Sequence, residues 1–202
     1  MALTEIGEIG IYAGDRTVTL RPSLAAMARL GDGAAIVATF DELHRLKVLP
    51  TASAAWVNRA LHLRFLTAVQ VLQACTDEDI SDLTGYQGQS LRSWVPGLIQ
   101  PNIAVHLARS LMAHGLLGVV PDDDRYEPEP SAPSMTSEFR PADIAAMAMA
   151  HLGYTEQEAW NLTVTAFTLA MRAKFPPPAR KTPTVKEHDA TMAWLAEVNK
   201  GR

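Results

Sequence analysis

The chain of 202 residues is long enough for one or two domains, and it contains 48% apolar and 20% charged residues. These fractions are typical of globular proteins and argue against wholesale disorder. The net charge of -4 argues against nucleic acid as the main partner, and the single cysteine, Cys75, excludes an internal disulfide. The N-terminal stretch MALTEIGEIG lacks the basic region and apolar run of a secretory signal, so we expect a cytoplasmic protein.

The first fifty residues predict a small β-hairpin followed by two helices. Isoleucines at positions 6, 9 and 11 lie in an extended stretch, Ala13–Arg16 is typical of a turn, and Thr17–Leu20 alternates like a strand. Pro22 and Ser23 favour the start of a helix that reaches about Leu30. A second helix is expected over Ala34–Leu46, where apolar residues repeat with the helical period.

The longest apolar-rich run, Ala52–Cys75, predicts a long helix. It is not expected to cross a membrane, because polar residues interrupt it throughout. Most of them recur three or four positions apart, so we expect one solvent-exposed stripe on an otherwise buried helix. These polar residues are Asn58, Arg59, His62, Arg64, Thr67, Gln70 and Gln73.

Residues 76–118 admit a second interpretation, a helix-turn-helix or winged-helix segment that binds DNA. Thr76 is expected to cap a first helix, Gln89–Val95 to form a second, and Asn102–Gly115 a third. Gln87, Gln89 and Arg92 are available for phosphate or base contacts, but the region is rich in aspartate. An ordinary helical bundle is therefore favoured over a DNA-binding regulator.

An acidic, proline-rich segment divides the chain. Residues 121–138 hold four prolines, six acidic residues and one basic residue, a composition typical of a linker. We expect a body over 1–120 and a small, separate helical domain over 139–202. The predicted fold class is mainly α: a helical bundle preceded by a small N-terminal β-hairpin, plus the C-terminal domain.

The C-terminal part is expected to contain several short helices. Pro141 is typical of the first turn of a helix that reaches Leu152. Thr155 and Glu158 form a capping-box pattern for the next helix, and Thr163 is the expected cap of the one after it.

No residue pattern predicts catalysis, a cofactor or a metal site. The chain lacks the sequence signatures of serine hydrolases, nucleotide-binding loops and zinc proteases, so we expect a protein that is not an enzyme. The six histidines are scattered without ligand spacing. Cys75 follows an apolar helix and is interpreted as a buried structural residue.

Aromatic residues are frequent in the last sixty residues and predict partner binding. Most of them would form the core of the small domain, but so small a unit seldom builds a complete core alone. Exposed aromatic side chains make effective anchors for a partner surface. The candidate partner-binding residues are Trp160, Phe167, Phe175, Pro176 and Trp194.

Two stretches resemble the tail assembly chaperones of long-tailed bacteriophages. The stretch GYTEQEAWNLTVTAFTLAMRAKFPP is similar to the C-terminal segment of that family at Gly153, Trp160, Thr163 and Phe167. The stretch IYAGDRTVTLRPSLAAMARLGDGAAIVATFDEL is similar to the family's N-terminal start, a small β element followed by two helices. Together the two stretches cover 58 of the 202 residues.

The resemblance implies a non-enzymatic role in virion morphogenesis, encoded by a phage or prophage. In that family the N-terminal domain is thought to coat the tape-measure protein, and the C-terminal extension to recruit the major tail-tube protein. The expected partners are these two proteins and further copies of the chain, without membrane or nucleic acid. The expected location is the host cytoplasm, and the protein is not expected in the mature virion.

Overall fold

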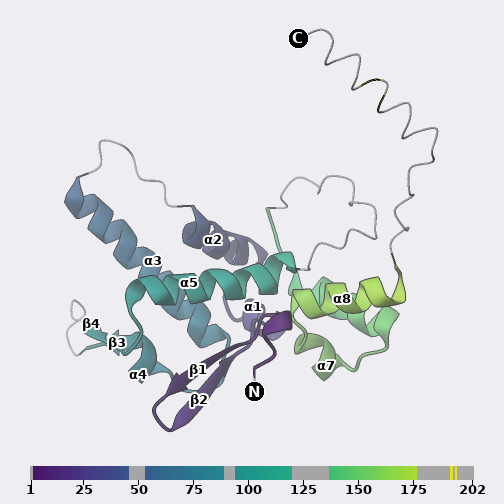
Figure 1. Cartoon of the computed structure of the whole chain (residues 1–202), viewed down its shortest axis with the longest axis horizontal. Helices are drawn as coiled ribbons and strands as arrows, with labels where there is room; N and C mark the ends of the chain where they lie inside the picture. Colours follow the sequence, from purple (N-terminus) through teal and green to yellow (C-terminus); the bar gives the residue numbers. More distant parts are fainter. Residues whose placement is uncertain are drawn as a thin grey trace.

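A computed structural model describes residues 2–45, 53–88, 94–119 and 137–176, together with Met192 and Trp194, which are helical. The mainly α fold with an N-terminal hairpin is confirmed (Figure 1). The first part contains β1 Ile9–Ala13, β2 Arg16–Leu20, α1 Leu24–Ala28, α2 Gly33–His44, α3 Ala54–Ala74, α4 Ser81–Thr84, β3 Gly85–Gln87, β4 Trp94–Pro96 and α5 Pro101–Met112, with a short 3-10 helix, η1 Thr4–Ile6, before β1. The second contains α6 Pro141–Met147, α7 Glu156–Trp160 and α8 Val164–Lys174. Two π-helical turns, η2 Ala113–Leu117 and η3 Ala148–Leu152, extend α5 and α6.

The N-terminal hairpin forms where the sequence predicts it. Strands β1 and β2 are antiparallel, with Ile9 opposite Leu20 and Ala13 opposite Arg16. The turn contains Gly14 at a φ of 60°, a conformation that favours glycine. Val18 and Leu20 are fully buried, so β2 places one face of the hairpin on the core.

Side-chain caps explain where several helices begin. The Ser23 hydroxyl accepts a hydrogen bond from the Ala26 amide and starts α1, and the Asp32 carboxylate does the same for α2 from Ala35. The predicted capping box of Thr155 and Glu158 is confirmed, as is the predicted cap of α8 by Thr163. These starts are local features, which is why sequence patterns locate them well.

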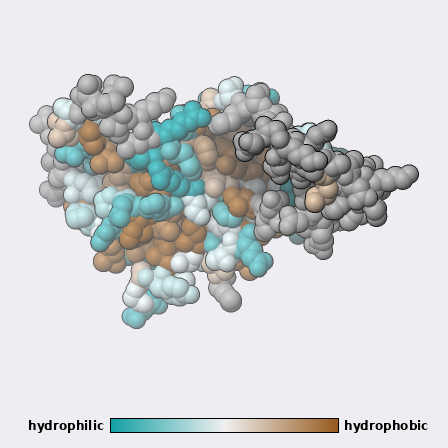
Figure 2. Space-filling model, turned by 45° about the horizontal axis from the view of Figure 1, so that its top comes forward, coloured by the Kyte–Doolittle hydropathy of each residue, from teal (hydrophilic) through white to brown (hydrophobic). Residues whose placement is uncertain are grey.

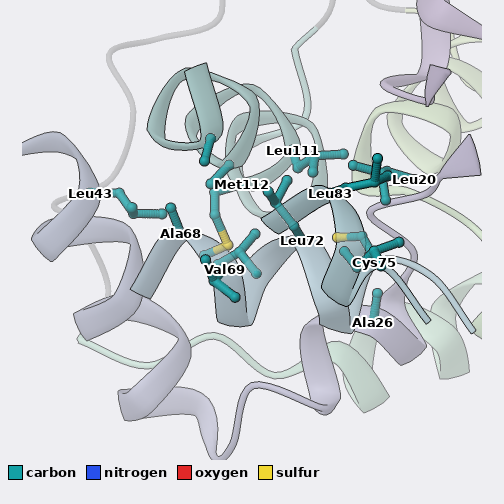
Figure 3. Close-up of a cluster of buried hydrophobic side chains, with 14 of the residues drawn as sticks. Leu20, Ala26, Leu43, Ala68, Val69, Leu72, Cys75, Leu83, Leu111 and Met112 are labelled. Carbon is teal, nitrogen blue, oxygen red and sulfur yellow. The ribbon is translucent and has the colours of Figure 1, made fainter. Parts of the chain in front are cut away.

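The main core lies where α3 crosses α5, and strand β2 of the hairpin packs against it. Figure 3 shows the C-terminal half of α3 directing Ala68, Val69 and Leu72 toward Leu111 and Met112 of α5. The cluster is completed by side chains of β2, α1, α2 and α4, and Cys75 lies within it. The interpretation of Cys75 as a buried residue is confirmed.

Two helices predicted between residues 76 and 95 differ in the structure. Thr76 does not cap a helix; its hydroxyl accepts from the Glu78 amide, and α4 begins only at Ser81. Trp94–Pro96 forms strand β4, which pairs with β3, whereas a helix was expected over Gln89–Val95. The pairing of β3 with β4 supplies backbone hydrogen bonds that a local pattern does not reveal. Residues 89–93 lie outside the described residues.

The C-terminal helices have a core of their own, and they are fixed against the body. Leu24 of α1 is part of their cluster, together with Ala145, Ala159 and Phe167. The Leu24 amide donates to the Leu162 carbonyl at 2.8 Å. The two predicted parts are therefore distinct in sequence but packed side by side in space (Figure 1). The predicted linker lies outside the described residues as far as position 136.

Three further contacts hold this junction. The Thr163 hydroxyl donates to the Ile6 carbonyl at 2.8 Å, and the Phe139 amide donates to the Gly33 carbonyl at 3.2 Å. The His114 Nδ1 lies 2.9 Å from the Thr165 hydroxyl, and partial burial lowers the pKa of His114. Polar contacts of this kind fix the orientation of one unit on the other.

Candidate functional site

The two halves of α3 differ sharply in burial, and the exposed half defines the candidate site. None of the residues from Ala54 to Leu63 is buried, whereas seven of the residues from Arg64 to Ala74 are buried. Figure 1 shows the N-terminal half extending beyond α5 at one end of the molecule. The prediction of a single solvent-exposed stripe is therefore wrong for this half, which has solvent around most of its circumference.

Large apolar side chains lie on this exposed half. Trp56, Leu61 and Leu63 expose 43%, 47% and 50% of their surfaces. Figure 2 shows apolar areas separated by polar bands at the end of the molecule where α3 begins in Figure 1. Exposed apolar areas bordered by polar residues are typical of sites that contact another protein. Because α3 begins with a capped turn, in which Ser53 accepts from the Trp56 amide, the surface is held in helical form.

A shallow hollow of about 300 Å³ lies between this half of α3 and the end of α2. Its apolar floor comes from Trp56, Ala60 and Leu63, which recur at helical spacing along α3. Charged side chains of both signs surround the floor: Asp41, Glu42, Arg45 and Arg59. This hollow suits an apolar side chain ringed by polar contacts.

A second hollow, of about 360 Å³, lies between α3 and α5; we call it the α3/α5 groove. Leu61 and Phe65 of α3 form one wall, and Val105 of α5 forms the other. Pro101 and Asn102 lie at one end, at the start of α5, with His106 along the groove. Two arginines, Arg64 and Arg109, lie in the groove.

Both arginines donate to the same carbonyl oxygen. Arg109 Nε donates to the Leu43 carbonyl at 2.7 Å, and Arg64 Nη2 donates to it as well. This arrangement caps the C-terminal end of α2, where cations are favoured. Burial lowers the pKa of the Arg64 guanidinium, and the nearby charge of Arg109 lowers it further. The groove thus combines apolar walls with two like charges.

The aromatic candidates from the sequence fall into two groups. Trp160 and Phe167 pack in the C-terminal cluster, where Phe167 is buried and Trp160 half-buried. Phe175 and Trp194 expose 52% and 62% of their surfaces, and Pro176 is exposed beside Phe175. The Phe175 ring lies edge-on to His151, with centroids 6.2 Å apart. The structure brings Phe175 and Pro176 together at the end of α8.

The sequence did not single out Trp56, Leu61, Arg64 or Arg109 as a site. Apolar residues around most of the circumference at the start of a long helix are one signal that was available, because such a helix needs cover on every side. The α3/α5 groove left no local signal, since it arises from two helices that are distant in sequence.

The described residues also bear on metal, membrane and thiol chemistry. No group of three or more metal-ligating side chains comes together there. None of the described helices is both long and apolar enough to span a membrane. Burial raises the pKa of the Cys75 thiol from an ordinary value of 9.0 to about 12, with a smaller opposing effect of Arg29. A thiol in this state is a poor nucleophile near neutral pH.

Comparison with known proteins assigns the chain to a family. Residues 20–190 match a family of unknown function, DUF6246, and the chain belongs to that family. The match spans α1 to α8 and includes the whole of the exposed half of α3. Comparisons with curated proteins and with solved structures gave no significant match.

Proposed function

We propose that the chain is a tail assembly chaperone of a long-tailed phage or prophage, which shields the tape-measure protein and recruits major tail-tube subunits. The observation that carries this proposal is the exposed apolar half of α3, from Ala54 to Leu63. It is helical before any partner binds, so docking a second helix on it costs little ordering entropy. The resemblance at Gly153, Trp160, Thr163 and Phe167 supports the same role.

The physical reason for such a role is that a client with exposed apolar helices needs to be covered. A tape-measure protein is long, helical and apolar, and it aggregates if it is left bare. An apolar helix packs on another by fitting side-chain ridges into grooves, and each contact excludes water. Many copies of the chain, each presenting α3, would cover such a client in the host cytoplasm without entering the mature virion.

Recruitment of the tail-tube protein falls to the end of α8 and the residues beyond it. The helices over 137–174 are fixed on the body through Leu24, Thr163 and Gly33. The exposed aromatic side chains Phe175 and Trp194, with Pro176 between them in sequence, are the available anchors in this part. This arrangement presents the two partner surfaces at opposite ends of one body.

The test is co-expression with the tape-measure and tail-tube proteins of the same genome, followed by affinity capture. We expect the wild-type chain to capture both partners. Trp56→Ala should weaken capture of the tape-measure protein alone, and the double variant Phe175→Ala, Trp194→Ala should weaken capture of the tail-tube protein alone. Capture of neither partner by the wild-type chain would refute the proposal.

Tyr12→Ala is a matched control, because Tyr12 lies in the hairpin with 83% of its surface exposed. It removes an exposed aromatic side chain of similar size, and we expect capture of both partners to be unchanged. Point variants are preferable to deletion of 139–202, because that deletion removes the residues that cover Leu24.

A further inference from the structure

We propose that the α3/α5 groove binds a partner helix that carries a carboxylate within its apolar face, with the carboxylate meeting Arg64 and Arg109. The inference deepens the proposed function, on which it rests for the identity of the partner as the tape-measure protein. It adds a chemical requirement that apolar contact alone does not impose: the bound segment must contain an acidic residue among apolar ones.

The first support is that the two guanidinium groups lack a carboxylate. Within the described part of the chain, neither Arg64 nor Arg109 forms an ion pair with an aspartate or glutamate. Both donate to one neutral carbonyl oxygen, that of Leu43. Arg64 is only 6% exposed, and its buried Nε has no hydrogen-bond partner. Glu42 is close enough to affect Arg64 but makes no ion pair with it.

The second support is the energetic consequence of this arrangement. A buried cation is costly unless it is paired, and two cations that share a groove repel each other. A ligand carboxylate would offset both the cost of the unpaired buried cation and the repulsion between the two cations, because it accepts several hydrogen bonds and carries the opposite charge. The apolar walls formed by Leu61, Phe65 and Val105 then require that the carboxylate be attached to an apolar surface.

The third support concerns the start of α5, at one end of the groove. Gln100 makes no side-chain capping bond there, and Pro101 lacks an amide hydrogen. The following backbone amides, those of Asn102 and Ile103, are left without a capping side chain, and the helix dipole adds positive potential. The electrostatic potential of the groove is therefore positive both at this end and at the arginine pair.

The shape of the surface favours a protein segment over a small molecule. Leu61 of the groove lies on the exposed half of α3, and Trp56 and Leu63, which line the other hollow, add exposed apolar surface to the same half. The residues from Ala54 to Leu63 span about 15 Å, close to the length of a few helical turns of a partner. Charge complementarity then places the acidic residue of the partner at Arg64 and Arg109.

The experiment uses two synthetic amphipathic helices of about 18 residues, roughly five turns. Both carry a leucine face, and they differ only in a central glutamate or glutamine on that face. Binding to the full-length chain is measured by fluorescence anisotropy of labelled peptide. We expect the glutamate peptide to bind about tenfold more tightly, the value of one good charge-assisted hydrogen bond. Equal affinity for the two peptides, or binding of neither, overturns the inference.

Variants at exposed positions test where the selectivity arises. Leu61→Glu places a carboxylate one helical turn from Arg64, and we expect it to abolish the preference for the glutamate peptide. Leu63→Glu is the matched control, because Leu63 is similarly exposed but lines the other hollow, and it should keep the preference. Arg109→Gln, checked for folding by circular dichroism, should reduce the preference as well. A preference unchanged in both Leu61→Glu and Arg109→Gln overturns the assignment.

A second arm separates this inference from the proposed function. The same variants are co-expressed with the tape-measure protein. If the wild-type chain prefers the glutamate peptide but captures no tape-measure protein, the proposed function fails and the groove assignment stands. If the wild-type chain captures that protein and shows no peptide preference, the groove assignment fails and the proposed function stands.

Discussion

The two halves of α3 have similarly apolar sequences and opposite surroundings. From Arg64 to Ala74 the helix is enclosed by α5, α2 and the hairpin, whereas from Ala54 to Leu63 it has solvent on most sides. The buried half therefore contributes to the stability of the fold, since its apolar side chains are removed from water. The exposed half contributes little to stability, and its apolar side chains are available to a partner. The contrast shows that composition alone does not tell a buried helical segment from an exposed one.

The largest expected difference between the halves is in thiol reactivity. Near pH 8, a thiol with a pKa of about 12 is ionised about a thousandfold less than one with a pKa of 9.0. We expect Cys75, at the end of the buried half, to resist alkylation in the folded chain. A cysteine introduced by Ala55→Cys in the exposed half should react at the rate of a free thiol. Similar rates at the two positions, measured by mass spectrometry, would contradict the contrast.

The same pKa predicts a pH dependence of stability. In the unfolded chain the Cys75 thiol ionises from about pH 9, whereas in the folded chain it stays neutral to about pH 12. Ionisation therefore favours the unfolded state between these values, at about 1.4 kcal/mol per pH unit. The contribution of this thiol to stability is intact below pH 9 and is lost as pH rises from there. Cys75→Ala should remove this component of the dependence in denaturant titrations.

Truncation of one leucine in each half gives the next largest difference. Leu72 is fully buried, so Leu72→Ala should lower the free energy of unfolding by about 3 kcal/mol through lost contacts and a cavity. Leu63→Ala should change it by no more than about 0.5 kcal/mol, because Leu63 is half exposed. Chemical denaturation measures both values. Equal losses would mean that the exposed half is covered, for example by a second copy of the chain.

The smallest expected difference in the free energy of unfolding is between two helix caps, a buried one at α8 and an exposed one at α3. The buried Thr163 hydroxyl accepts from the Ala166 amide and donates to the Ile6 carbonyl, so Thr163→Ala should cost about 1–2 kcal/mol. Ser53 caps the exposed half of α3, and Ser53→Ala should cost about 0.5 kcal/mol or less. The second loss is smaller because fraying of the first turn of α3 breaks no core contact. Thermal unfolding with calorimetry distinguishes the two losses.

Local signals predicted the parts of the fold that depend on neighbouring residues. The hairpin, the caps at Ser23, Thr155 and Thr163, and the course of α2 follow from turn chemistry, capping and periodicity. Strand β4 was missed because its hydrogen bonds come from β3, outside the local pattern. The expectation that most of the aromatic residues form the core holds for Phe167 and Trp160, which pack in the C-terminal cluster, but not for Phe175 and Trp194, which are exposed.

The candidate site was less accessible to prediction than the fold. The spacing of polar residues placed Arg64 in a solvent-exposed stripe, but Arg64 is buried because α2 ends against it and its guanidinium caps that end. Arg109 is 45 positions further along the chain, and nothing in its own neighbourhood links the two residues. The groove exists because α3 and α5 cross, which is a property of the tertiary structure.

The junction between the two parts has a consequence for synthesis of the chain on the ribosome. Leu24 and the Ile6 and Gly33 carbonyls emerge early, but their partners, Leu162, Thr163 and Phe139, emerge more than a hundred residues later. At roughly 5–20 residues per second, Leu24 stays uncovered for about 7–28 seconds. During that interval the nascent body carries an apolar patch that the finished protein conceals. A product that terminates before residue 137 would keep this patch exposed permanently. A short form and a full-length form of the chain would therefore differ in their tendency to aggregate as well as in length.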